Sequence, residues 1–169
     1  MQAAVPPYGH VTEEVVQCIA QASSRYTVPE LLLHAIITVE GGRTGKVVKN
    51  KNGSLDMGLA QINTSWLEYF SKFGITADHL IYNSCTNVQA SAYILRYNAN
   101  LFKQNWQDAI MAYNIGPNNW TDARKAIGFR YATQVISTWW GFQNWVDAYG
   151  APRQLSSFPP EPAPSEFPR

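Results

Sequence analysis

Apolar residues recur every three or four positions along most of the chain, and this pattern predicts a mainly helical protein. Thr12 and the two acidic residues after it are typical of a helix start, and Pro29 suits the first turn of the next helix. Shorter helical segments are expected near 64–70 and 78–81. The longer expected helices span residues 12–26, 29–40, 86–103, 106–113, 120–127 and 130–149.

Residues 46–58 break this helical pattern and carry the β signal of the chain. Val47 and Val48 suit a short strand, and Asn52-Gly53 is typical of a two-residue turn between antiparallel strands. The expected fold class is therefore mainly α, of the α+β kind, and consists of a compact helical domain with one small β-hairpin.

The domain organisation follows from the length and from the distribution of proline. A chain of 169 residues suits one domain with a core of its own. Residues 1–11 are expected to be an irregular lead-in, and residues 12–149 the folded domain. Residues 150–169 hold six of the ten prolines, so this tail is expected to be extended and poorly ordered.

The last expected helix is rich in large aromatic residues, namely Trp139, Trp140, Phe142, Trp145 and Tyr149. Such a set at helical spacing is typical of a stripe that packs on the core, and this interpretation is favoured. A face for a partner protein is the alternative.

Charge and composition exclude several classes of protein. The net charge is +1 and lysine and arginine do not cluster, which argues against nucleic-acid binding. No apolar run reaches the length of a membrane span. His10, His34 and His79 fall on separate elements without ligand spacing, so neither a metal ion nor another cofactor is expected. A monomer is expected.

Cys18 and Cys85 are the two cysteines of the chain, and they form no C-x-x-C pair. Two buried free thiols and a disulfide between an early and a later helix are both compatible with their spacing. Residues 1–7 lack a basic region followed by an apolar stretch, so no signal peptide is expected among them. The sequence then represents either a cytosolic protein or a mature form with an added Met.

Glu40 is the residue around which the candidate chemistry is organised. It shares one helical face with Leu33, Ile36 and Ile37, and that face is otherwise apolar. A Gly-Gly pair follows and ends the helix, so a negative charge at Glu40 would oppose the helix dipole. Both features favour the neutral acid, which can donate its proton to a leaving group near neutral pH. The alternative is an exposed glutamate at a fraying helix end.

Asp56 follows the Asn52-Gly53 turn, on the returning arm of the hairpin. A hairpin after a helix end can place this second carboxylate across from Glu40. Two carboxylates in different environments are typical of glycosidic bond cleavage. The alternative is that Asp56 bonds backbone N–H groups of the turn.

Several short motifs occur together within about residues 12–140. They are Tyr26-x-Val28-Pro29-x-Leu31-Leu32, Glu40-Gly41-Gly42, Gly58-Leu59-Ala60-Gln61-Ile62-Asn63, Ala112-Tyr113-Asn114-Ile115-Gly116 and Tyr131. The set resembles the soluble lytic transglycosylase family of the lysozyme-like superfamily. Within that family it is most similar to the small enzymes that accompany type III and type IV secretion or conjugation machinery. The Ser54-x-Asp56 passage also resembles the hairpin of animal-type lysozymes.

The resemblance implies a lysozyme-like fold with the hairpin beside an active-site cleft, and peptidoglycan glycan strands as the substrate. The cut falls between N-acetylmuramic acid and N-acetylglucosamine. Glu40 would protonate the bridging oxygen and then, as a carboxylate, take a proton from the muramyl 6-hydroxyl. That hydroxyl closes on the anomeric carbon and leaves a 1,6-anhydro end without consuming water. The sugar's own N-acetyl group would stabilise the charge between these steps, an exception to the two-carboxylate scheme.

The resemblance also implies roles for further residues. Gln61 and Asn63 belong to the motif expected to line the cleft. Tyr113 is expected close to the catalytic glutamate, Asn114 to bond the acetamido group of the substrate, and Tyr131 to lie near the catalytic carboxyl. Without the resemblance, Tyr113-Asn114 indicates a helix end with asparagine as a cap.

Cys18 and Cys85 match positions that are paired as a disulfide in the secretion-associated subgroup. The resemblance therefore implies this disulfide and, with it, a periplasmic or secreted location. A protein of a secretion or conjugation apparatus is the expected partner.

Three positions depart from the usual family pattern. Gly41 stands where serine is usual, so a hydroxyl that could bond the carboxylate is lost. Ala60 replaces a methionine, which is larger and more adaptable. Asp56 is acidic, which keeps open a hydrolytic lysozyme that uses two carboxylates. A lysozyme-like domain that only binds glycan or a partner protein is the remaining alternative.

Overall fold

The computed structural model describes residues 12–150, so the lead-in expected at 1–11 and all but the first residue of the tail expected at 150–169 lie outside the described residues. The helices of the described part are α1 (Glu13–Tyr26), α2 (Glu30–Glu40), α3 (Leu67–Ser71), α4 (Ala77–Tyr82), α5 (Ser84–Leu101), α6 (Trp106–Ile115) and α7 (Asp122–Tyr149). A 3-10 turn, η1 (Thr64–Trp66), precedes α3, and the strands are β1 (Val47–Lys49), β2 (Leu55–Met57) and β3 (Ile62–Asn63). This mainly helical architecture with a small antiparallel sheet confirms the expected fold class.

The first helix forms as its sequence predicts. The Thr12 side chain accepts a hydrogen bond from the Val15 backbone N–H, and two glutamates occupy the first turn. The apolar positions of α1 face inward, and Ile19 and Ala22 are fully buried. Helix α1 ends at Thr27, whose φ of 53° lies in the left-handed region.

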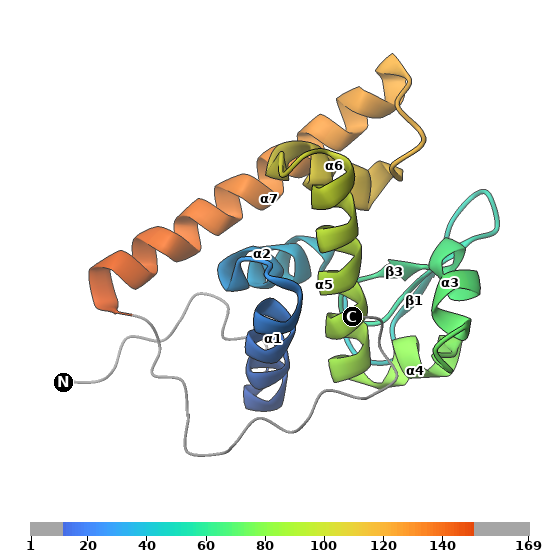
Figure 1. Cartoon of the computed structure of the whole chain (residues 1–169), viewed down its shortest axis with the longest axis horizontal. Helices are drawn as coiled ribbons and strands as arrows, with labels where there is room; N and C mark the ends of the chain where they lie inside the picture. The colour runs from blue at the N-terminus through green and yellow to red at the C-terminus, as the bar shows by residue number, and fades with distance from the viewer. Residues whose placement is uncertain (1–11, 151–169) are drawn as a thin grey trace.

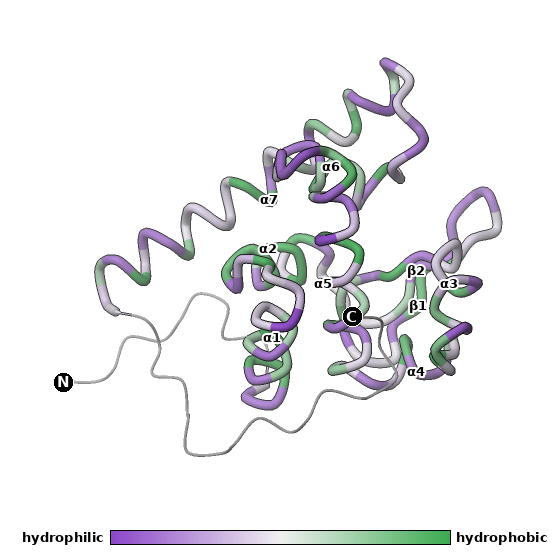
Figure 2. Tube along the Cα trace, viewed as in Figure 1, coloured by the Kyte–Doolittle hydropathy of each residue, from purple (hydrophilic) through white to green (hydrophobic). Residues whose placement is uncertain are grey.

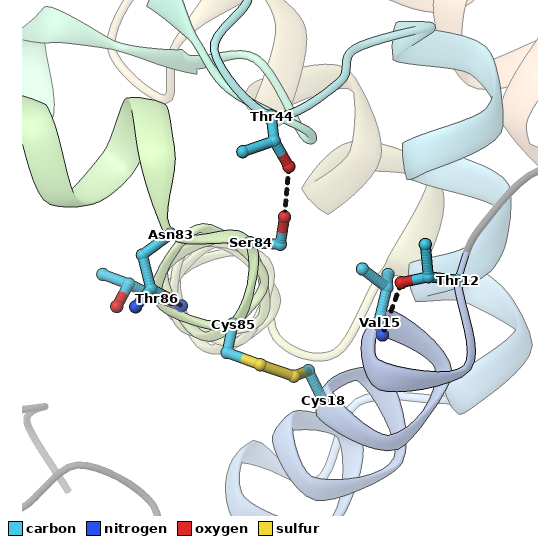
Figure 3. Close-up of a disulfide and its surroundings, with 8 residues drawn as sticks. All are labelled: Thr12, Val15, Cys18, Thr44, Asn83, Ser84, Cys85 and Thr86. Atoms are coloured by element: carbon cyan, nitrogen blue, oxygen red, sulfur yellow. Dashed lines mark hydrogen bonds between the residues drawn. A yellow bond between two sulfur atoms is a disulfide. The ribbon is translucent and has the colours of Figure 1, made fainter.

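Helix α5 is the centre of the fold (Figure 1). It packs against α1, α4 and α6, and most of its residues from Thr86 to Ala99 are buried. A disulfide joins Cys85 at its start to Cys18 of α1 (Figure 3). The two Cα atoms are 5.2 Å apart, within the usual range for a disulfide.

The sheet is slightly larger than the single hairpin predicted from the sequence. β1, β2 and β3 pair antiparallel in that order, and Asp56 is the residue opposite both Val48 and Asn63. The predicted two-residue turn is wrong, because the Asn50 N–H bonds the Ser54 carbonyl and leaves a three-residue loop. Gly53 takes a φ of 85° in that loop, as the third position of such a loop requires.

The predicted break between residues 127 and 130 is also wrong, because α7 runs unbroken from Asp122 to Tyr149. Gly128 lies within this helix and lets it approach α6 closely. A Cβ at Gly128 would lie 3.1 Å from Ile115 Cδ1 and 3.3 Å from Met111 Cβ, so packing on α6 outweighs the low helix propensity of glycine. Helix α6 likewise continues two residues past its expected end at 113.

The aromatic residues of α7 are divided between the core and the surface. Phe142 is buried and Trp139 packs partly against the core, as expected for a stripe on the core. Trp140 and Tyr149 are instead 63% and 67% exposed. Figure 2 shows that hydrophilic and hydrophobic residues alternate along α7, whereas α2 is apolar along most of its length. Within residues 12–150 no helix combines the length and hydropathy needed to cross a membrane.

Candidate active site

Glu40 is the last residue of α2, and the helix ends there because Gly41 takes a left-handed φ of 59°. The helix before it is anchored in the core by Leu33, Ile36 and Ile37, which are all but inaccessible to solvent. Glu40 is therefore held at a fixed point by a buried helix, while its carboxyl group emerges at the edge of the core.

Tyr131 of α7 makes the direct contact to this carboxyl group. Its hydroxyl donates a hydrogen bond of 2.5 Å to Glu40 Oε1, across 91 positions of sequence. Tyr131 is only 8% exposed, so α2 and α7 meet around a hydrogen bond that is largely withdrawn from water.

The pKa of Glu40 is raised from its ordinary 4.5 to about 7, and burial is the largest cause, in the direction expected from its apolar helix face. The hydrogen bond from Tyr131 opposes this shift because it stabilises the charged form. The negative charge of Asp56 raises the pKa further, and the ammonium group of Lys46 lowers it. Near neutral pH the group is therefore divided between acid and carboxylate.

Tyr113 and Tyr131 stay protonated around this carboxyl group. Burial, and then the charge of Glu40, raise the pKa of both phenols well above the ordinary value of 10.0. The Tyr113 hydroxyl donates to the Ala60 carbonyl at 2.9 Å and shares a hydrogen bond of 3.1 Å with Ser91 Oγ. Tyr113 thus interacts electrostatically with Glu40, while its own hydrogen bond to Ala60 holds the loop before β3 in place.

Asp56 is held from both sides by amide groups. Asn50 Nδ2 donates to Asp56 Oδ2 at 2.9 Å, and Asn63 Nδ2 donates to Asp56 Oδ1 at 2.7 Å. Both amides also donate to Ser54 Oγ. The alternative given for Asp56 was a set of bonds to backbone N–H groups, and the structure shows side-chain amides in that place.

The loop between β2 and β3 is pressed against the end of α2. A Cβ at Gly42 would come within 2.3 Å of the Gly58 and Leu59 carbonyl oxygens, and one at Gly58 would overlap the Leu80 carbonyl. Only glycine fits at these two close approaches. Gln61 in the same loop has a φ of 51° and donates from Nε2 to the Gly58 carbonyl at 2.8 Å.

Asn114 and Asn63 complete the set of residues predicted from the sequence. Asn114 is exposed, next to Tyr113 in the last turn of α6. The Asn63 side chain bonds protein groups through both ends, because its Oδ1 also accepts from the Ser65 N–H. The structure therefore brings Tyr131, Tyr113 and Asp56 within hydrogen-bonding or electrostatic range of the Glu40 carboxyl group. Asn63 is bonded to Asp56 within the sheet, and Gln61 lies in the loop before β3.

Sequence reasoning missed Asn87 of α5, which positions the loop before β3. Its Nδ2 donates to the Met57 and Leu80 carbonyls at 2.8 and 2.7 Å, and its Oδ1 accepts from the Ala60 N–H at 2.8 Å. Asn87 is fully buried. A polar residue among the apolar positions of a central helix was the available signal.

Lys46 is the second residue missed. Its ammonium group donates to the Gly41 carbonyl at 2.9 Å, and its own carbonyl accepts from the Gly58 N–H at 2.8 Å. Lys46 therefore joins the end of α2 to the loop before β3, and places a positive charge where the dipole of α2 is negative. Among residues 12–150, no three His, Cys, Asp or Glu side chains gather as metal ligands.

The part of the chain that holds the candidate site is similar to known proteins. Residues 17–135 match the family described as "Transglycosylase SLT domain". That range contains Glu40 and Tyr131 and ends within α7.

Several curated proteins are similar over about the same length. "Invasion protein IagB" of Salmonella typhimurium (strain SL1344) is 32% identical over 119 residues, which cover 70% of this chain and 72% of that protein. "Protein IpgF" of Shigella flexneri is 34% identical over 119 residues, with 70% and 76% covered. "X polypeptide" of Escherichia coli is 28% identical over 129 residues, with 75% of each chain covered.

Proposed function

The chain belongs to the family of the transglycosylase SLT domain, and on that premise we propose that it is a lytic transglycosylase that cuts the glycan strands of peptidoglycan. The proposed cut lies between N-acetylmuramic acid and N-acetylglucosamine. Its product is a 1,6-anhydro end on the muramic acid.

The observation that carries this proposal is the state of Glu40. A carboxyl group with a pKa of about 7 can give up a proton and take one back at neutral pH. In the first step Glu40 protonates the bridging oxygen, and the bond from that oxygen to the anomeric carbon breaks. In the second step the Glu40 carboxylate removes the proton of the muramyl 6-hydroxyl, whose oxygen bonds the anomeric carbon. The proton balance closes on Glu40, and no water is consumed.

Tyr131 supports both steps from one position. Its hydroxyl bonds the Oε1 oxygen of Glu40, which leaves the other oxygen to face the substrate. Because this hydrogen bond stabilises the carboxylate, it keeps the pKa of Glu40 below the value that burial alone would give. Tyr131 is therefore proposed as the residue that orients and tunes the acid.

Other residues are proposed to hold the sugar. Asn114 is exposed beside Tyr113 and is available to bond an acetamido group. Gln61 lies in the loop that Tyr113 and Asn87 fix in place, and is proposed to line the glycan site. Asn63 is proposed to act there as well, through the sheet network that it shares with Asp56.

Hydrolysis is the second candidate, and one observation favours it. The charge of Asp56 acts on Glu40, so a second carboxylate lies within electrostatic reach of the acid. In a hydrolytic lysozyme this group would stabilise positive charge on the sugar while water attacks. Because two amide donors already engage both oxygens of Asp56, we favour the role of raising the pKa of Glu40.

The family and the disulfide also support a proposal for the cellular role. We propose a periplasmic or secreted enzyme, because its substrate is the cell wall and because the Cys18–Cys85 disulfide suits an oxidising compartment. The proposed task is to open the wall locally for a secretion or conjugation apparatus. A monomer suffices for this chemistry, since the residues named above come from one chain.

Digestion of purified sacculi tests the proposal directly. The soluble fragments are separated and weighed by mass spectrometry, with Glu40→Gln protein as the control. We expect fragments that end in 1,6-anhydro-muramic acid from the parent and none from the variant. Reducing ends that carry an added water would replace the transglycosylase with a hydrolase. Fragments released equally by the Glu40→Gln protein would remove Glu40 from the mechanism.

A further inference from the structure

A cavity of about 650 Å³ that is open to solvent on one side lies between the end of α1, the outer face of α5 and the segment that follows α5. Its size is within the range of small-molecule sites, about 300–1,000 Å³. The rings of Tyr26, Tyr93 and Tyr97 line one part of it, and the polar side chains of Arg96, Asn100 and Gln104 line another.

This cavity is separate from the candidate active site. Ser91 contacts Tyr113, so its side of α5 faces the site around Glu40. Tyr93, Tyr97 and Asn100 follow Ser91 by two, six and nine positions, which at 3.6 residues per turn puts them on the opposite side of the helix. Figure 1 shows α1 on one side of α5 and the sheet on the other side.

The aromatic part of the cavity is a packed cluster of rings, in which Tyr26 meets Tyr93 edge-on at 78°. The rings of Tyr93 and Tyr97 are stacked with centroids 6.4 Å apart and planes at 27°. Trp66 meets both rings edge-on, and the Tyr93 hydroxyl is hydrogen-bonded to the Tyr69 hydroxyl at 2.5 Å. Tyr97 remains 43% exposed, so part of this packed ring is accessible to solvent.

The polar part is equally fixed. Arg96 donates to the Tyr26 and Thr27 carbonyls and to Gln104 Oε1, so its guanidinium shapes the wall rather than offering a loose charge. Gln104 Nε2 in turn donates to Asn100 Oδ1 at 3.0 Å. Gln104 also has a φ of 67°, an uncommon conformation for a residue with a side chain. Such strain is retained where the surrounding structure holds it, and it occurs often at binding sites.

We infer that this cavity binds a saccharide, and specifically a stretch of glycan that the enzyme does not cut. Flat aromatic faces stack on the C–H faces of sugar rings, and neighbouring amide groups bond hydroxyl and acetamido groups. The choice of glycan rests on the proposed function, because the wall offers many strands around the one being cut. The site would hold the enzyme on the wall through a strand outside the active site.

The test compares soluble and insoluble substrates. Tyr97→Ala removes the exposed ring, and Asn100→Ala removes the amide beside it. Tyr82→Ala is the matched control, since Tyr82 is a 66% exposed tyrosine of α4 that does not line the cavity. We expect each cavity variant to digest sacculi about fivefold more slowly, because Tyr97→Ala loses a ring contact and Asn100→Ala loses a hydrogen bond. Soluble glycan fragments should be cut at the parental rate by every variant. Equal rates on sacculi for all four proteins would overturn the inference.

A second measurement does not depend on cleavage. Chitotetraose, a soluble oligomer of N-acetylglucosamine, is titrated into Glu40→Gln protein while backbone amide resonances are followed by NMR. We expect shifts at Asn100 and Gln104 that Tyr97→Ala removes. Shifts confined to residues around position 40 would overturn the inference and leave the proposed function intact. Shifts at the cavity together with sacculus fragments that lack 1,6-anhydro ends would support saccharide binding at the cavity and overturn the proposed function.

Discussion

The end of α2 and the β1–β2 hairpin each present one carboxyl group, and the two groups are held in different ways. Among residues 12–150, Glu40 receives one hydrogen bond, from a neutral phenol, and it lies at the end of a buried helix. Asp56 receives one amide hydrogen bond on each oxygen, from side chains that are themselves linked through Ser54. The first arrangement favours a group that gains and loses a proton. The second holds the Asp56 side chain in place through two donors. The comparison shows how two acidic residues close in space can serve different purposes.

Removal of the titrating group should have the largest effect. Glu40→Gln keeps the size of the side chain but cannot donate or accept the catalytic proton, so we expect activity on sacculi to fall by about 10²–10⁴-fold. Glu30→Gln, at the other end of the same helix, is the matched control and should retain activity. A loss smaller than tenfold would show that Glu40 is not the catalytic acid, whatever its surroundings.

The same substitution should reveal what burial of Glu40 costs in stability. Because folding raises the pKa from 4.5 to about 7, the folded state binds the proton more tightly, and its stability falls as pH rises through that interval. Glu40→Gln avoids this loss, so at pH 8 the variant should exceed the parent by roughly 3 kcal/mol in free energy of unfolding. At pH 4 the two should be nearly equal. Urea unfolding at both pH values measures this, and an equal difference at both would contradict it.

Asp56→Asn should have the smallest effect of the three. Loss of the negative charge lowers the pKa of Glu40, so the alkaline limb of the rate profile should move to lower pH and activity at pH 8 should fall by about tenfold. Tyr131→Phe is the opposite test, because removal of its hydrogen bond should move that limb to higher pH. A loss of more than about 100-fold at every pH for Asp56→Asn would assign Asp56 to charge stabilisation in a hydrolase.

Local sequence rules sufficed for the part of the site that lies on one helix. The apolar face of α2, the stop at Gly41 and the upward direction of the pKa of Glu40 all follow from neighbouring residues. Helix α7 was harder, because Gly128 indicates a break locally and packing on α6 reverses that outcome. The two-residue strand β3 was also missed, since so short a segment carries no periodic signal.

Contacts between distant segments could not be derived from local patterns. Tyr131 meets Glu40 across 91 positions, and only the family resemblance indicated that tyrosine in advance. Asn87 and Lys46 belong to no motif noted in the sequence, yet they join α5 and the end of α2 to the loop before β3. Their roles depend on which backbone groups the tertiary fold brings beside them, and a single sequence does not record that.

The disulfide between Cys18 and Cys85 closes a covalent ring with a sequence separation of 67. Glu40, Asp56 and Gln61 all lie inside that ring, and so does the exposed loop tip at residues 51–53. A protease that nicks this tip once therefore opens the ring without releasing a fragment. Under oxidising conditions the two pieces stay joined and the nicked enzyme migrates as one molecule, whereas reduction lets them part.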